Sequence, residues 1–175
     1  MKAVVIRQHG GIDKLLYEDV QKPTAGPGEV LVKIGASGVK HLDHDLREGV
    51  SGFGDTLPHV MGVEGVGEVV DLGEGVWSAE IGDRVAIDFA QVDPQSNMWL
   101  SGLDGTDFTH GRIGVTQWGT HAEYAVCLAT SLIKLPPTLS FEEAAASVIG
   151  FGTSWHMAVT LGQVQADKIV LINAA

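Results

Sequence analysis

The chain has 175 residues, of which 45% are hydrophobic, 6% are aromatic and 23 are glycine. This mix favours a turn-rich β domain over a helical bundle or a disordered chain, and the length suits one domain with a real core. Eleven basic and 22 acidic residues give a formal net charge of -11 without any basic run, so nucleic acid and anionic membranes are not expected partners.

The N-terminal residues and the cysteine content predict a cytoplasmic protein. The apolar run before Arg7 covers only residues 3–6, which is too short for the core of a signal peptide. No apolar run approaches membrane-spanning length. Cys127 is the one cysteine, so the chain forms no internal disulfide, and a reducing compartment is expected.

Short strand-like runs alternate with glycine, proline and aspartate turns from residue 1 to about residue 135. These runs cover residues 2–7, 15–20, 29–37, 65–73, 83–88, 121–129 and 132–136. Their close spacing predicts a folded-over roll or barrel rather than βαβ units. One polar segment, residues 41–49, is predicted to be a helical turn.

The pattern becomes helical at Ser140. Ser140 is followed three residues later by Glu143, a capping box that opens a helix. A second helix is predicted over 153–162, and the apolar residues 168–172 predict a buried strand of a parallel sheet. The glycine-rich turn that would follow such a strand in a dinucleotide-binding sheet does not occur in these 175 residues.

Several smaller expectations follow from single residues. Cys127 lies inside a predicted strand and is expected to be a small buried hydrophobe. Trp99 and Trp118 are expected to pack the long loop after residue 89 onto the roll. Residues 104–107 ("DGTD") lack the glutamate of a calcium loop and predict a solvated turn. His59 is interpreted as a surface or loop residue.

The order of several segments resembles the medium-chain dehydrogenase/reductase family. The segments are "LLYEDV", "GPGEVLVKIGASGV", "GVEGVGEVVDLGEGV", "GDRVAI", "GTHAEYAV", "LPPTLSFEEAAA" and "GTSWHMAV". The resemblance covers essentially the whole chain and implies a mainly β, GroES-like roll or partly open barrel for residues 1–135. It implies that residues 136–175 hold linking helices and the first strand of an incomplete nucleotide-binding domain. A chain that stops there is expected to be inactive alone.

The resemblance also implies where a catalytic zinc would bind in this family. Its ligands would stand at Lys40, Val63 and Ile149, and none of these residues offers a zinc ligand. The clustered cysteines of the family's structural zinc lobe are missing as well. The family's zinc-free branch is therefore predicted, an NADP- or NAD-dependent oxidoreductase that reduces an activated alkene, quinone or carbonyl in a small molecule.

In that branch the substrate cleft lies between the two domains, near the zinc position of the zinc enzymes. The predicted catalytic residues are Lys40, His41, Asp43, Asp45 and Glu64, and Thr153 is predicted to reach toward the nicotinamide. The Lys40 ammonium either polarises a substrate carbonyl or pairs with Asp43 or Glu64 to hold the segment in place. Asp43 has a second interpretation as a hydrogen-bond acceptor at the start of a helix.

Other interpretations stay open at the level of sequence. A metal site that combines His41 and His44 with nearby carboxylates and Glu64 can be drawn, but histidine and aspartate on an exposed turn are more often plain surface residues, so no metal is predicted. The chain is alternatively a free-standing, non-catalytic GroES-like binding or assembly module, or an enzyme of another kind. An exposed strand at 168–172 invites pairing with a second chain, so a homo-oligomer is expected.

Overall fold

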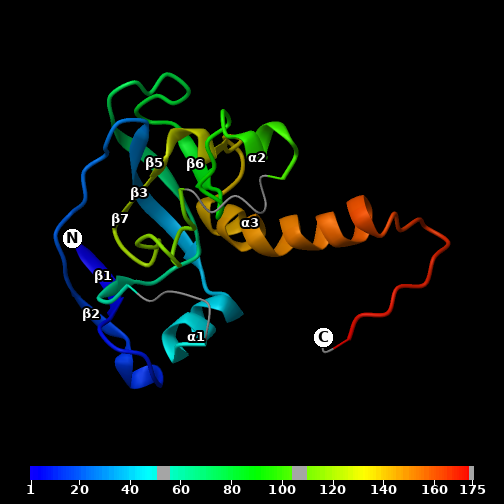
Figure 1. Ribbon diagram of the computed structural model, residues 1–175, viewed down its shortest axis with the longest axis horizontal. Helices are drawn as coiled ribbons and strands as arrows, with labels where there is room; N and C mark the ends of the chain where they lie inside the picture. Colours follow the sequence, from blue (N-terminus) through cyan, green and yellow to red (C-terminus); the bar gives the residue numbers. More distant parts are fainter. Residues whose placement is uncertain (51–55, 104–109, 174–175) are drawn as a thin grey trace.

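The computed structural model describes residues 1–50, 56–103 and 110–173, and within these ranges eight strands form two antiparallel sheets beside one long helix (Figure 1). The sheets and α1 gather at one end of the molecule. Helix α3, drawn in orange, runs outward from them, and the chain after it is extended (Figure 1). The predicted mainly β architecture is confirmed.

The larger sheet has the strand order β7-β3-β5-β6-β8. Its central strands are β3 (Glu29–Gly38) and β5 (Glu64–Leu72), flanked by β7 (Tyr124–Leu128), β6 (Arg84–Ile87) and β8 (Leu132–Lys134). The register between β3 and β5 shifts twice, at Leu31/Val32 and at Ile34/Ala36. Such irregularities bend a strand and increase its twist, which curves this sheet around its own core.

The smaller sheet has the order β2-β1-β4. It consists of β1 (Lys2–Ile6), β2 (Leu16–Asp19) and β4 (His59–Val60), and the turn η1 (Ile12–Lys14) joins the first two. Strand β4 is missed by the sequence analysis because two residues are too few to show an alternating pattern. His59 in this strand is buried, so its interpretation as a surface or loop residue is wrong.

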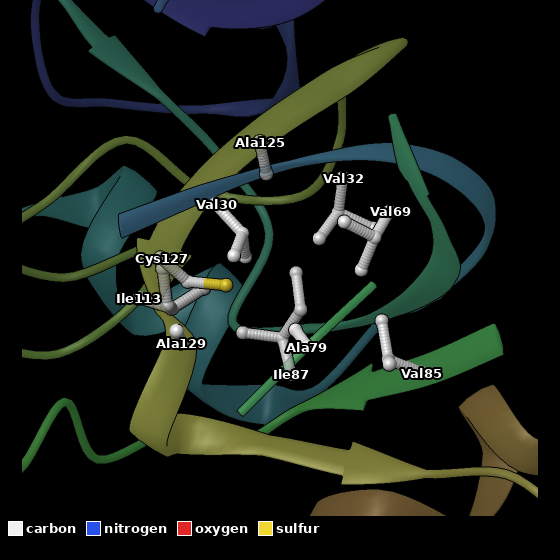
Figure 2. Close-up of a cluster of buried hydrophobic side chains, with 10 residues drawn as sticks. All are labelled: Val30, Val32, Val69, Ala79, Val85, Ile87, Ile113, Ala125, Cys127 and Ala129. Carbon is white, nitrogen blue, oxygen red and sulfur yellow. The ribbon is translucent and has the colours of Figure 1, made fainter. Parts of the chain in front are cut away.

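Small aliphatic side chains fill the main core inside the larger sheet. Figure 2 shows them converging from β3, β5, β6 and β7 and from adjoining loops: Val30, Val32, Val69, Ala79, Val85, Ile87, Ile113, Ala125, Cys127 and Ala129. Burial raises the pKa of the Cys127 thiol, and its predicted role as a buried hydrophobe is confirmed. Gly67 permits the close approach of β3, because a Cβ there would meet the backbone carbonyl oxygen of Lys33.

Helix α1 (His41–Glu48) confirms the helical turn predicted over residues 41–49. Gly49 ends this helix in the left-handed conformation with φ of 77°, which glycine adopts without steric cost. Two shorter helical segments lie in the loops, α2 (Asn97–Leu100), which Ser96 caps, and η3 (Ala129–Ser131).

Helix α3 (Phe141–Trp155) begins with the predicted capping box. Ser140 Oγ accepts the N–H of Glu143, and the Glu143 carboxylate accepts the N–H of Ser140. The sequence predicts two separate helices here, but α3 continues without a break into the π-helical segment η4 (His156–Leu161). The helical structure ends at Gly162, as predicted. A glycine inside a helix costs only about 1 kcal/mol, so Gly150 and Gly152 weaken the helix without ending it.

The segment after Gly162 differs from the sequence expectation. Residues 168–172 pair with no strand among the described residues, and Ile169 is 100% exposed. A strand needs neighbouring strands to satisfy its backbone hydrogen bonds, and the roll offers none at this point. The strand expected over 168–172 is therefore absent from the described structure.

Two further expectations concern the long loop. Trp99 and Trp118 are roughly half exposed, and Trp118 lines a small cavity together with Glu29 of β3 and Tyr124 of β7. The turn predicted over residues 104–107 lies outside the described residues. Among the described residues, no helix has both the length and the apolar character needed to span a membrane.

Candidate active site

An ion pair between Lys40 and Glu64 lies where α1, β5 and α3 meet. Lys40 Nζ is 2.8 Å from Glu64 Oε1, and 26% of the lysine side chain is exposed whereas the glutamate side chain is fully buried, at 0%. The second carboxylate oxygen, Oε2, accepts the backbone N–H of Ile149 at 2.5 Å. A buried carboxylate is costly unless it is paired and hydrogen-bonded, so Glu64 holds these three elements together.

Gly38 makes room for this pair, and Gly150 lies beside it. A Cβ at Gly38, at the end of β3, would collide with Glu64 Oε1, and a Cβ at Gly150 would lie 3.7 Å from Lys40 Nζ. The carboxylate therefore packs directly against the backbone of β3. The ammonium faces the backbone of α3.

The structure brings together the positions that the family resemblance assigns to a catalytic zinc. Lys40 and Ile149 both bind Glu64, and Val63 immediately precedes Glu64 on the chain. Zinc binds thiolate, imidazole or carboxylate ligands. An ammonium and two aliphatic side chains supply none of these, and the positive charge of Lys40 repels a cation. The residues at these positions do not fit the family's catalytic zinc.

Asp43 is buried, and both of its oxygens accept backbone hydrogen bonds. Oδ2 accepts the N–H of Lys40 at 2.8 Å, and Oδ1 accepts the N–H groups of Gly62 and Val63, each at 3.2 Å. The side chain thus caps α1 and fastens this helix to the segment that enters β5. This agrees with the helix-start interpretation of Asp43.

His41 and Asp45 lie on a different face of α1. The His41 side chain is 86% exposed, and its Nε2 is 3.5 Å from Asp45 Oδ1. The side chain of Asp45 also faces His44, whose Nδ1 lies 3.4 Å from the same oxygen. The structure therefore groups the predicted residues into two sets, Lys40 with Asp43 and Glu64 inside, and His41 with Asp45 outside.

Two cavities adjoin the ion pair. The first, of about 570 Å³, has mostly apolar walls and is lined by Val4, Ile12, Leu15, Ser37, Val39, Lys40, Asp43, His44, Arg47, Met61 and His121. The second, of about 380 Å³, is lined by Asp88, Phe89, Ile133, Val148, Ile149, Gly152 and Thr153. Lys40 and Thr153 thus line separate cavities.

Sequence reasoning missed several groups at this site. The N–H donors of Gly62, Val63 and Ile149 carry no side-chain signature, because any residue offers them. His121 Nε2 lies 3.1 Å from the Gly38 carbonyl oxygen and beside the Lys40 cavity. An isolated histidine in a strand-like run gives no sign of that contact.

Comparison with known proteins decides the family. Residues 26–137 match the alcohol dehydrogenase GroES-like domain. The chain belongs to this family. The similarity to alcohol dehydrogenases and to a quinone oxidoreductase described next also confirms the predicted resemblance to the medium-chain dehydrogenase/reductase family.

Individual relatives of this GroES-like domain cover most of the chain. An alcohol dehydrogenase of Geobacillus stearothermophilus is 37% identical over 146 residues, 83% of this chain and 43% of the relative. The crystal structure of an NAD-dependent alcohol dehydrogenase has a TM-score of 0.87 at 37% identity, over 95% of this chain and 49% of that one. A quinone oxidoreductase of Pseudomonas syringae has a TM-score of 0.74 at 27% identity, over 94% and 42%. The chain spans about half the length, or less, of the curated relatives it matches.

Proposed function

We propose that this chain is the catalytic domain of a zinc-independent, NAD(P)H-dependent oxidoreductase that reduces an activated alkene, quinone or carbonyl. The single observation that supports it best is the Lys40–Glu64 ion pair, because the resemblance assigns the first ligand of the family's zinc to the position of Lys40. Relatives named alcohol dehydrogenase and quinone oxidoreductase support the oxidoreductase class. Residues 1–135 form the substrate side in this proposal, and residues 136–175 lead into a nucleotide-binding domain.

The cavity beside Thr153 suits a nicotinamide ring. Phe89, Ile133 and Ile149 give it apolar walls, and the Thr153 hydroxyl is a hydrogen-bonding group on the exposed side of α3. When bound, the nicotinamide supplies the hydride. The role proposed for this part of the chain is to orient the ring and to exclude water from one of its faces.

Lys40 is the residue proposed to act on the substrate. Its ammonium lines the larger apolar cavity, where a fixed positive charge stabilises negative charge that develops on a substrate oxygen. Glu64 offsets part of this charge, but it also holds the ammonium in position, so that little reorganisation is needed during the reaction. The proton that completes the reduction comes from solvent in this proposal.

Activity in the presence of a chelator tests the zinc-independent assignment. The assay follows oxidation of NADH and NADPH, with enone, quinone and aldehyde acceptors, by the protein that carries this chain joined to a nucleotide-binding domain. Turnover is expected to be unchanged after dialysis against 1,10-phenanthroline, while a zinc alcohol dehydrogenase treated in parallel loses activity. Loss of turnover that added zinc restores would overturn the assignment.

A further inference from the structure

We propose that the exposed face of α1 is a binding site for a divalent transition metal such as Zn²⁺, formed by His41, His44 and Asp45. This site is separate from the positions of Lys40, Val63 and Ile149, and it does not depend on the proposed function. The sequence allows such a site with Glu64 as a member, but no metal is predicted from it. In the structure Glu64 is instead buried in its pair with Lys40, and Asp45 supplies the carboxylate.

The spacing of the three residues places them on one face of the helix. Positions i, i+3 and i+4 of an α-helix are surface neighbours. One nitrogen of each histidine and one oxygen of Asp45 lie within 4.8 Å of one another. The imidazole rings of His41 and His44 are stacked nearly parallel, with 9° between their planes and 5.4 Å between their centroids, so one exposed ring must turn for a single ion to lie in both ring planes.

The distances fit ligands arranged around a common ion. Zinc binds histidine nitrogen at about 2.0–2.1 Å and carboxylate oxygen at about 2.0–2.2 Å, so tetrahedral ligands lie roughly 3.3–3.5 Å apart. Asp45 Oδ1 is 3.5 Å from His41 Nε2 and 3.4 Å from His44 Nδ1. Both separations are longer than the 2.7–2.9 Å or so of a charge-assisted hydrogen bond. They leave room for a metal between the three atoms.

A second carboxylate supports the orientation of His44. While Nδ1 of this ring faces Asp45, Nε2 lies 3.6 Å from Glu48 Oε1. A histidine that binds a metal through one nitrogen usually donates its other N–H to a carboxylate or carbonyl, which fixes the ring and raises its basicity. At 3.6 Å this separation is an ionic contact and not a hydrogen bond, and the same oxygen accepts a hydrogen bond from Arg47 Nη2 at 2.7 Å. Glu48 is placed to become the acceptor of the His44 Nε2–H once a metal occupies Nδ1, which would make it a positioning residue.

The surroundings leave the site open and without unpaired cations close by. His41 is 86% and His44 is 52% exposed, so water can complete the coordination. The neighbouring cations are paired, Lys40 with Glu64 and Arg47 with Glu48. Helix α1 lies at the edge of the molecule, with the described strands to one side of it (Figure 1).

Two imidazoles and one carboxylate suit Zn²⁺, Cu²⁺ or Ni²⁺, with Cu²⁺ expected to bind most tightly.

Titration of the metal-free 175-residue chain tests the proposal directly. Calorimetry with Zn²⁺ is expected to show one saturable site per chain, and Co²⁺ to show the visible absorption of a low-symmetry site with nitrogen ligands. His41→Ala and His44→Ala are each expected to weaken binding by more than tenfold. Glu48→Gln, which removes the positioning contact, is expected to weaken it roughly tenfold.

His156→Ala is the matched control, because His156 is an exposed histidine on a different helical segment, and it should leave the affinity unchanged. Thermal melting without metal should be the same for the wild type and for His44→Ala, whereas Zn²⁺ should raise the melting temperature of the wild type only. Absence of a saturable site, or one-to-one binding that survives His41→Ala/His44→Ala, would overturn the proposal. Chelator-resistant turnover tests the proposed function separately, so either result can fail alone.

Discussion

Lys40 has a structural role and a proposed catalytic role, and single and double variants together separate the two. Its ammonium neutralises the fully buried carboxylate of Glu64, and a quarter of the side chain, 26%, remains open to the adjoining cavity. Removing one member of a buried pair leaves an uncompensated charge. A stabilising role is therefore required by the geometry, and a role in turnover is an additional proposal.

Lys40→Met is expected to lower the free energy of unfolding by roughly 2–3 kcal/mol, less than for a fully buried pair because Lys40 is partly exposed. Urea unfolding of the 175-residue chain measures this. In Lys40→Met/Glu64→Gln most of the loss should be recovered, because no charge is then left buried. An equal loss in the single and the double variant would contradict the ion-pair account.

The catalytic proposal for Lys40 needs a separate measurement. In the protein joined to a nucleotide-binding domain, Lys40→Met/Glu64→Gln should lower turnover per folded molecule by about tenfold or more, since the positive charge near the substrate oxygen is lost. Glu64→Gln alone keeps the ammonium and serves as the control. If Lys40→Met/Glu64→Gln turns over at the wild-type rate, Lys40 is purely structural.

His59 is expected to make stability depend on pH. Burial is the main cause that lowers the pKa of this imidazole, and its Nε2 lies 2.8 Å from the Gly114 carbonyl oxygen. In the unfolded chain histidine takes up a proton near pH 6.5, but in the fold it does so only at lower pH. The stabilisation is therefore fully present above about pH 6.5 and is lost as the pH falls below that value.

Urea unfolding at pH 7.5 and at pH 5 measures this dependence. His59→Gln keeps an N–H donor for the Gly114 carbonyl but does not titrate, so its stability should fall less between the two pH values than that of the wild type. Equal losses in both proteins would show that other groups carry the pH dependence.

At the scale of elements, one carboxylate connects α1 to the larger sheet. Asp43 accepts hydrogen bonds from the backbone of Lys40 at the start of the helix and of Gly62 and Val63 before β5. The helix therefore cannot shift relative to β5 without breaking these bonds. Since Lys40 precedes α1 and Glu64 begins β5, Asp43 also sets the geometry of their ion pair.

Asp43→Ala is expected to cost about 2–4 kcal/mol of unfolding free energy, because three backbone N–H groups lose their acceptor in a buried place. Chemical denaturation followed by circular dichroism measures the loss. Asp45→Ala on the same helix is the control and, in metal-free buffer, should change stability by less than about 0.5 kcal/mol. A similar loss in both variants would mean that helix propensity, rather than the link to β5, is responsible.

At the scale of the whole molecule, the C-terminal part carries exposed apolar residues. Phe151, Trp155, Leu161 and Ile169 are all exposed, although such side chains are usually buried. We propose that they meet a nucleotide-binding domain or a second copy of the chain, in keeping with the homo-oligomer expected from sequence. Contiguous exposed apolar surface is typical of such contacts.

The 175-residue chain alone is expected neither to bind NADPH measurably nor to reduce an acceptor, and to self-associate through its C-terminal segment. Fluorescence titration with NADPH tests the first part, and light scattering with and without residues 163–175 tests the second. Removal of the segment should reduce association and leave the melting temperature unchanged, because these residues are exposed. Micromolar NADPH affinity, or a monomer with the segment intact, would contradict this account.

The sequence by itself determined the elements whose signals are local. Alternating apolar runs located the strands of the larger sheet, and Ser140 with Glu143 located the start of α3, because capping involves residues only three positions apart. The residue types at Lys40, Val63 and Ile149 were enough to argue against the family's catalytic zinc, since ligand chemistry depends on the side chain present.

Tertiary structure decided everything that depends on partners distant in the chain. In the fold the Lys40 ammonium pairs with Glu64 rather than with Asp43. The N–H of Ile149 in α3 becomes the second partner of that carboxylate, and His59 is buried in a two-residue strand. Residues 168–172 have the composition of a strand but remain unpaired in the described structure. An apolar composition shows that a strand would be buried. Its backbone N–H and C=O groups, however, can be satisfied only by neighbouring strands.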